Sequence, residues 1–152
     1  MIYSGEITDE VRAWVFSQFP GAVVPKDYIY GTWQTDDVTG EIKGVCGLRL
    51  EDNGDMTHGI WCKNLHSWMT KEFKRQFYVL NFEIVGGDRV ITTVPLEERK
   101  FIYFIDEWTS ELPGTKIYDD MSRGRNNTGV RVYSLTKEDY FKAKDEGIWL
   151  PE

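Results

Sequence analysis

Residues 54–87 read G-D-M-T-H-G-I-W-C-K-N-L-H-S-W-M-T-K-E-F-K-R-Q-F-Y-V-L-N-F-E-I-V-G-G. Residues 56–62 predict a strand, which a loop joins to a helix over residues 69–85. Apolar residues recur at helical spacing along one face of that helix, at Met69, Phe73, Phe77, Leu80 and Ile84. Gly86 and Gly87 provide the expected stop. The segment therefore predicts a strand, a loop and an amphipathic helix in succession.

Positive charge gathers where the helix begins. Its first two turns carry Lys71, Lys74 and Arg75, opposed only by Glu72. Cations at a helix N-terminus oppose the helix dipole and cost roughly a few tenths of a kcal/mol each. A bound anion would reverse that cost, because the free N–H groups and the cations would converge on it. The sequence therefore predicts an anion site here, and leaves open the alternative of a solvated charged face.

Composition narrows the functional class. The 152 residues predict a single domain, and the net charge of −7 argues against a general binder of nucleic acid or of anionic membranes. Cys46 and Cys62 are too few for a disulfide framework, and no Cys or His spacing suggests a metal site. We find no signal peptide and no apolar run long enough to span a bilayer, so we expect a cytoplasmic protein.

The order of predicted elements gives the fold class. A short strand at residues 2–3 precedes a helix capped by Thr8, and a C-terminal helix opens with Thr136 and Asp139. Strands are predicted at 28–34, 42–50, 56–62, 89–94, 116–121 and 130–135, with a second amphipathic helix at 96–108. Asn53–Gly54 marks a hairpin turn. The order β-α-β-β-β-α-β-α-β-β predicts an α+β fold, with a mixed, mostly antiparallel sheet flanked by helices.

Three segments carry a resemblance to a known family. They are G-D-M-T-H-G-I-W-C at 54–62, G-D-R-V-I-T-T-V-P-L-E-E-R-K-F-I-Y-F-I-D-E-W at 87–108, and Y-D-D-M-S-R-G-R-N-N-T-G-V-R-V-Y-S-L-T-K-E-D-Y at 118–140. Together they resemble the GNAT N-acetyltransferase superfamily, in particular its small phage-encoded and ribosomal-protein-acetylating members. The resemblance implies that acetyl-CoA is the cosubstrate and binds between the fourth and fifth strands. It also implies direct transfer of the acetyl group to an amine of a protein or small molecule.

The resemblance also implies which residues form the site. It places the CoA pyrophosphate on the loop that opens the 69–85 helix, the same place that the cations indicate. The implied cofactor contacts are Ile60, Cys62, Asn64, His66, Ser67, Trp68, Met69, Thr70, Lys71, Lys74, Arg75 and Glu98. His58 is the candidate base, because an unperturbed imidazole titrates near a pKa of about 6.5. The alternative is a purely structural role, in which His58 occupies a partly exposed strand position and takes no part in the chemistry. Tyr118 is the candidate donor to the departing thiolate.

Departures from the family pattern support a second hypothesis. Trp68 stands where the family's phosphate loop has its first glycine, Glu98 where an asparagine is frequent, and Ile105 where a tyrosine is frequent. The alternative is a catalytically degenerate GNAT-fold phage accessory protein that binds a host or virion protein in the host cytoplasm. The aromatic and β-branched final hairpin also suits pairing with a second copy as a homodimer.

Overall fold

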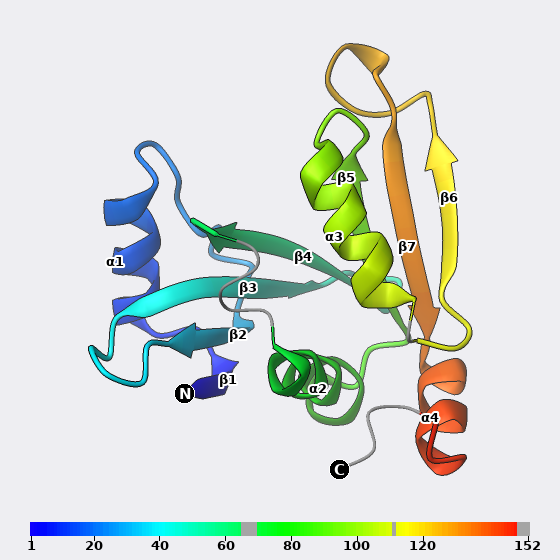
Figure 1. The fold of residues 1–152 in the computed structure, drawn as a ribbon, viewed down its shortest axis with the longest axis horizontal. Helices are drawn as coiled ribbons and strands as arrows, with labels where there is room; N and C mark the ends of the chain where they lie inside the picture. The colour runs from blue at the N-terminus through cyan, green and yellow to red at the C-terminus, as the bar shows by residue number, and fades with distance from the viewer. Residues whose placement is uncertain (65–69, 111, 149–152) are drawn as a thin grey trace. The chain divides into compact units, whose positions relative to one another are not determined.

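The computed structural model describes residues 1–64, 70–110 and 112–148 (Figure 1). The chain forms two compact units, Met1–Gly86 and Gly87–Glu152. Their element types and order confirm the predicted α+β class with mostly antiparallel strands. The prediction of a single domain stays a prediction. Among the described residues, no helix combines the length and the apolar character that crossing a membrane requires.

The first unit is built on four antiparallel strands. They are β1 (Ile2–Glu6), β2 (Tyr30–Thr35), β3 (Ile42–Leu50) and β4 (Asp55–Cys62), paired in that order. The predicted turn at Asn53–Gly54 joins β3 to β4, and Gly54 has a φ of +90°, which a side chain would disfavour. The β3–β4 hairpin thus forms where its turn residues predict it.

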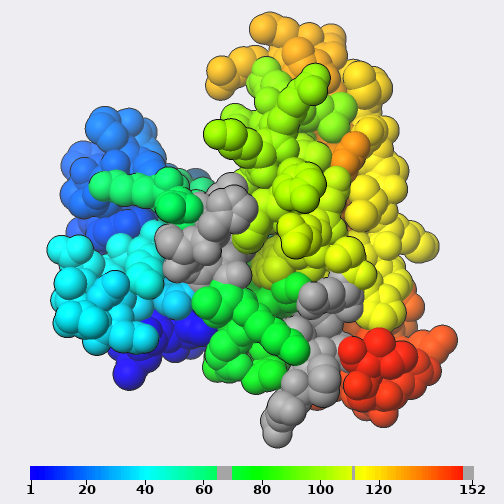
Figure 2. Space-filling model, in the orientation of Figure 1, coloured from blue at the N-terminus to red at the C-terminus, as the bar shows by residue number. Residues whose placement is uncertain are grey.

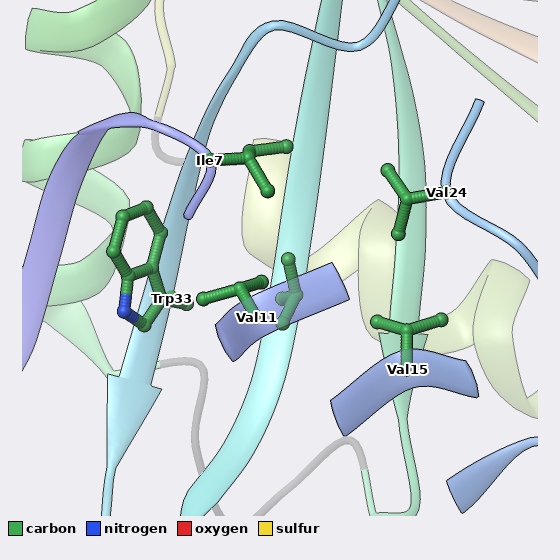
Figure 3. Close-up of a cluster of buried hydrophobic side chains, with 6 residues drawn as sticks. Ile7, Val11, Val15, Val24 and Trp33 are labelled. Atoms are coloured by element: carbon green, nitrogen blue, oxygen red, sulfur yellow. The ribbon is translucent and has the colours of Figure 1, made fainter. Parts of the chain in front are cut away.

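Helix α1 (Asp9–Gln18) covers one face of this sheet. Thr8 caps it as predicted, since its hydroxyl accepts a hydrogen bond from the Val11 N–H at 3.2 Å. Val11 and Val15 are buried in a cluster with Trp33 of β2 and Val45 of β3, which Figure 3 shows together with Ile7 and Val24. In the sheet, Val45 is paired with Trp33 on one side and with Trp61 on the other.

Helix α2 (Lys71–Val79) covers the opposite face and continues into the π-helical segment η2 (Leu80–Val85). Side chains alternate along a strand, so His58 of β4 points away from the α1 side, and its ring lies 4.8 Å from that of Phe77. Thr70 accepts a hydrogen bond from the Phe73 N–H at 3.1 Å and so caps the start. Gly86, with a φ of 76°, ends the helix as predicted.

Within the described residues, the predicted inner face of this helix is confirmed from Phe73 to Leu80 and wrong at Ile84, while Met69 lies outside those residues. Phe73, Phe77 and Leu80 are buried, whereas Ile84 is 63% exposed. The reason is the π turn, in which the Gly86 N–H bonds to the Asn81 carbonyl five residues earlier. The wider turn changes which side chains face the sheet, so that Asn81 and Phe82 are buried in place of Ile84.

The second unit pairs three strands, β5 (Arg89–Pro95), β7 (Val130–Thr136) and β6 (Lys116–Asp120), in the antiparallel order β5-β7-β6. Its helices are α3 (Arg99–Thr109), the 3₁₀ turn η3 (Arg125–Asn127) and α4 (Lys137–Asp145). Thr136 caps α4 as predicted, accepting from the Asp139 N–H at 3.2 Å. Helix α3 begins three residues later than predicted, at Arg99, because a turn closed by Glu98 N–H to Pro95 O comes first.

Polar contacts join α3 to the strands of its unit. Arg131 of β7 donates to Asp106 of α3 at 2.7 Å and to Asp119 of β6 at 2.8 Å. The Tyr133 hydroxyl donates to the other Asp106 oxygen at 2.5 Å. Ile105, where the family pattern has a tyrosine, is buried in the core. The side of α3 that carries Asp106 is therefore held by ion pairs rather than open for chemistry.

Candidate cofactor site at the start of α2

Strand β4 presents three candidate residues to the α2 side of the first sheet. His58, Ile60 and Cys62 share that face because they alternate along the strand, and each is half-buried. Ile60 pairs with the buried Cys46 of β3. Burial raises the pKa of the Cys46 thiol, so it stays a neutral, packed group at neutral pH.

Asn81 fixes the hydrogen bonding of His58. Its side-chain Nδ2 donates to the Phe77 carbonyl at 2.7 Å, which turns Oδ1 toward His58 Nε2 at 2.8 Å. An amide oxygen only accepts, so Nε2 carries the hydrogen. A neutral His58 therefore has its lone pair on Nδ1, an atom that is itself buried. Asn81 was not identified as a site residue from the sequence. It lies four residues after Phe77 on the apolar face, where a polar side chain indicates a buried hydrogen bond.

The start of α2 keeps backbone donors available. The Thr70 hydroxyl accepts a hydrogen bond from the Phe73 N–H. The Thr70 carbonyl accepts the first intrahelical hydrogen bond, from the Lys74 N–H at 3.0 Å. The N–H groups of Lys71 and Glu72 precede that bond and point out of the helix end. Such a helix end favours an anion through both its N–H groups and its dipole.

The three predicted cations do not share one open surface. Lys71 is exposed. Arg75 donates to Glu72 in an i, i+3 ion pair, which balances its charge. Lys74 is only 5% exposed and lies on the buried side of the helix beside Phe73. Of the three predicted cations, only Lys71 is therefore both exposed and without an ion pair among the described residues. The candidate anion site thus has less exposed positive charge than the sequence indicates.

The remaining predicted residues fall in three places. Asn64 is exposed just after β4. His66, Ser67, Trp68 and Met69 lie outside the described residues. Glu98 and Tyr118 belong to the second unit, where Glu98 is exposed directly ahead of α3 and makes no capping bond, and Tyr118 is 56% exposed on β6.

A diphosphate group fits the described part of this site. Two outward N–H groups and the exposed Lys71 offer hydrogen-bond donors and positive charge to a phosphate oxygen. Thr70 supplies a neutral hydroxyl rather than a carboxylate in the capping position, and Glu72, the acid of the first turn, is paired with Arg75. The donor set is therefore that of an anion site.

A groove of about 820 Å³ opens in the first unit. Its walls come from α1, the β2–β3 turn and the residues that follow β4, namely Glu10, Ala13, Trp14, Ser17, Gln18, Thr39, Gly40, Glu41, Ile42, Lys43, Lys63 and Asn64. In the part of the chain that the structure describes, the carboxylates of Glu10 and Glu41 have no hydrogen-bond or ion-pair partner. Lys43 lies 3.9 Å from Asp36, which offsets its charge. No sequence pattern predicts this groove, because its carboxylates come from segments that are far apart in the chain.

No family model and no curated protein matches the chain. Solved structures match over nearly its whole length. Glutamate-to-glutamine mutant forms of the spermidine/spermine N-acetyltransferase SpeG from Vibrio cholerae superpose with a TM-score of 0.70 at 9% identity, covering 93% of this chain and 98% of that one. A putative acyl-CoA N-acyltransferase from Klebsiella pneumoniae subsp. pneumoniae MGH 78578 superposes with a TM-score of 0.59 at 10% identity, covering 90% and 96%.

These neighbours are acetyltransferases and acyltransferases of the GNAT fold. At such low identity the likeness concerns the path of the chain. This chain has the GNAT fold.

Proposed function

We propose that the chain is an acyl-CoA-dependent N-acetyltransferase that transfers the acetyl group of acetyl-CoA to an amine. The observation that carries the proposal is the start of α2, where the exposed Lys71 and two N–H groups without an intrahelical acceptor follow β4 in a chain with the fold of N-acetyltransferases. The anion assigned to this helix end is the CoA pyrophosphate.

The chemistry asks little of the protein. The amine nitrogen bonds to the acetyl carbon and the carbon–sulfur bond breaks. A base accepts the proton that the amine loses, and a donor protonates the departing thiolate to give free CoA. Alignment and a proton acceptor are the main requirements. The role of His58 as this acceptor stays a prediction, since Asn81 holds Nε2–H and the remaining ring nitrogen, Nδ1, is buried. The role of Tyr118 as donor to the thiolate stays a prediction.

The groove beside α1 is the proposed acceptor site. The carboxylates of Glu10 and Glu41, which have no partner among the described residues, would attract an ammonium group, although Lys63 of the same groove opposes it. Trp14 offers an aromatic wall against which an alkyl chain or a cation packs. Spermidine acetyltransferases are among the matching solved structures, so a polyamine is the first acceptor to assay.

Calorimetric titration with acetyl-CoA and with CoA tests the proposal directly. Binding of both, together with release of free thiol when a polyamine or a peptide amine is added, is the expected result. Absence of binding at millimolar acetyl-CoA would end the enzyme hypothesis.

The acceptor site has its own test. Glu10→Gln and Glu41→Gln should raise the KM for a cationic amine while the Kd for acetyl-CoA stays unchanged, because each removes a charge from the groove only. Glu6→Gln, on the exposed end of β1, is the matched control. An unchanged KM would remove the acceptor role from the groove and leave the reaction in place.

The burial of Lys74 and the pairing of Arg75 with Glu72 favour one alternative. If the charges of Lys74 and Arg75 do not contact CoA, the protein would be a GNAT-fold protein that has lost acetyl transfer and binds a protein partner instead. A chain that binds no CoA but captures a defined host or virion protein, with an affinity that survives washing, would support it.

A further inference from the structure

Strand β6 leaves one edge of the second unit's sheet uncovered. Among the described residues it pairs with β7 alone and stands at the end of the order β5-β7-β6. Ile117 is 46% exposed, Tyr118 is 56% exposed and Met121, directly after the strand, is 60% exposed. Figure 2 shows the yellow atoms of residues 116–120 at the surface. An edge strand with unpaired backbone groups and apolar side chains is a template for another strand.

The charges on one face of β6 are self-complementary. Lys116, Tyr118 and Asp120 share that face because side chains alternate. In an antiparallel pair related by a two-fold axis at Tyr118, Lys116 of each copy faces Asp120 of the other, and the two Tyr118 rings face each other. Opposite charges and aromatic pairs directly across from one another stabilise antiparallel strands.

These groups are available, whereas those of the other face are not. Asp119 lies on the other face and is held by Arg131. Lys116 has no ion pair within the described ranges. Asp120 uses Oδ1 to accept from the Ser122 hydroxyl and N–H, which leaves Oδ2 for a partner. Those hydrogen bonds also lower the pKa of Asp120, so it carries its charge at neutral pH.

We propose that β6 is the interface of a homodimer, formed by antiparallel pairing of two β6 strands about Tyr118. Charged residues often protect an edge strand from other chains. In β6 the charged residues also favour the antiparallel orientation, since an in-register parallel pairing would place Lys116 beside Lys116 and Asp120 beside Asp120. The pairing gives Tyr118 a role different from the thiolate donor that the family resemblance implies. It does not depend on the proposed enzyme activity.

The interface is small. Stable dimers usually bury at least about 1,200 Å² in total, which strands of five residues reach only with help from flanking side chains such as Met121. We therefore expect a weak dimer, which forms as the protein is concentrated and weakens as salt screens the Lys116–Asp120 pairs.

Analytical ultracentrifugation of the full chain over a wide concentration range tests the proposal. The native sequence should dimerise reversibly, Lys116→Asp should weaken the dimer by about tenfold or more, and the double variant Lys116→Asp with Asp120→Lys should restore it, because the pair is re-formed with its charges exchanged. Lys100→Asp, on the exposed side of α3, makes the same charge change away from β6 and should leave the dimer intact. Circular dichroism confirms that each variant is folded.

Three results would overturn the proposal. The first is a native protein that stays monomeric at every concentration. The second is a dimer that Lys116→Asp leaves unchanged, which would place the interface elsewhere. The third is a double variant as weak as Lys116→Asp alone, since charge exchange must restore the pair if β6 strands meet in this register.

Discussion

Helices α2 and α3 look alike in the sequence and differ in their surroundings. Each follows a strand, each is amphipathic, and each begins with cations, Lys71 in α2 and Arg99 in α3. Helix α2 is capped by the neutral Thr70, whereas α3 follows two exposed carboxylates, Glu97 and Glu98, and has no side-chain cap. We therefore expect an anion to bind at the start of α2 rather than of α3, because neighbouring acids offset the cations of α3.

The two helices are also held differently. Helix α2 carries polar side chains on its buried side, with Asn81 fully enclosed and bonded to His58. Helix α3 is joined to its strands by Asp106, through an ion pair to the partly exposed Arg131 and a hydrogen bond from the buried Tyr133. A buried amide is costly to leave unpaired, whereas an ion pair near solvent contributes little. Substitutions in the two helices should separate these cases.

The largest effect is expected at Asn81. Asn81→Leu removes both of its side-chain hydrogen bonds and leaves His58 Nε2 and the Phe77 carbonyl to find other partners, so we expect a loss of about 2–4 kcal/mol in the free energy of unfolding. Urea unfolding followed by circular dichroism measures it. Asp106→Asn in α3 is the matched polar substitution and should cost less. Equal losses would show that the two helices are anchored alike.

Charge reversal at the helix starts should come next. Lys71→Glu should weaken acetyl-CoA binding by about tenfold, which corresponds to roughly 1.4 kcal/mol, because it places a carboxylate against the pyrophosphate. Arg99→Glu makes the same change in the first turn of α3 and should leave the affinity unchanged. Calorimetric titration measures both. If the two variants behave alike, the anion site is not at α2.

Capping should give a smaller difference. Thr70→Ala removes the acceptor for the Phe73 N–H and should lower the free energy of unfolding by about 1 kcal/mol. Glu98→Ala should change it little, since Glu98 makes no side-chain capping bond. Thermal unfolding distinguishes them, and a marked loss for Glu98→Ala would show that α3 depends on that carboxylate after all.

The smallest effect concerns pH. Hydrogen bonds from Arg131 lower the pKa of Asp119 in the folded state, so the folded protein binds this proton less readily than the unfolded chain. The resulting stabilisation is present above the unfolded pKa, near 4, and is lost as pH falls through the folded value. Asp119→Asn should therefore flatten the dependence of stability on pH between about pH 5 and 3. Unfolding curves of both proteins across that range measure it, and parallel curves would contradict the assignment.

Local signals in the sequence predicted most of the fold. The caps at Thr8 and Thr136 and the turn at Asn53–Gly54 form where predicted, because each depends on a residue type that satisfies nearby backbone groups. The burial of Phe73, Phe77 and Leu80 follows from helical spacing alone. These features need no knowledge of distant segments.

What the sequence did not predict depends on tertiary contacts. The sequence predicts Lys74 as a surface cation, yet it is only 5% exposed, which the apolar spacing of α2 does not indicate. Ile84 is exposed because the backbone widens after Val79. The groove brings together α1 and a turn some thirty residues later, a juxtaposition without a periodic pattern. The anion site at the start of α2 stays a prediction, and its exposed positive charge is smaller than the sequence indicates, because Lys74 is buried and Arg75 is paired with Glu72.

The π-helical end of α2 has a consequence for related chains. A segment that fits one extra residue into a helical turn is the shape an α-helix takes when it absorbs a single-codon insertion without shifting its flanks. Deleting one residue between Leu80 and Val85 would restore regular winding, turn Ile84 toward the sheet and withdraw Asn81 from His58. Relatives one residue shorter here would therefore be expected to lose the Asn81–His58 pair altogether. In such relatives, an alignment free of gaps across this helix would pair the wrong positions.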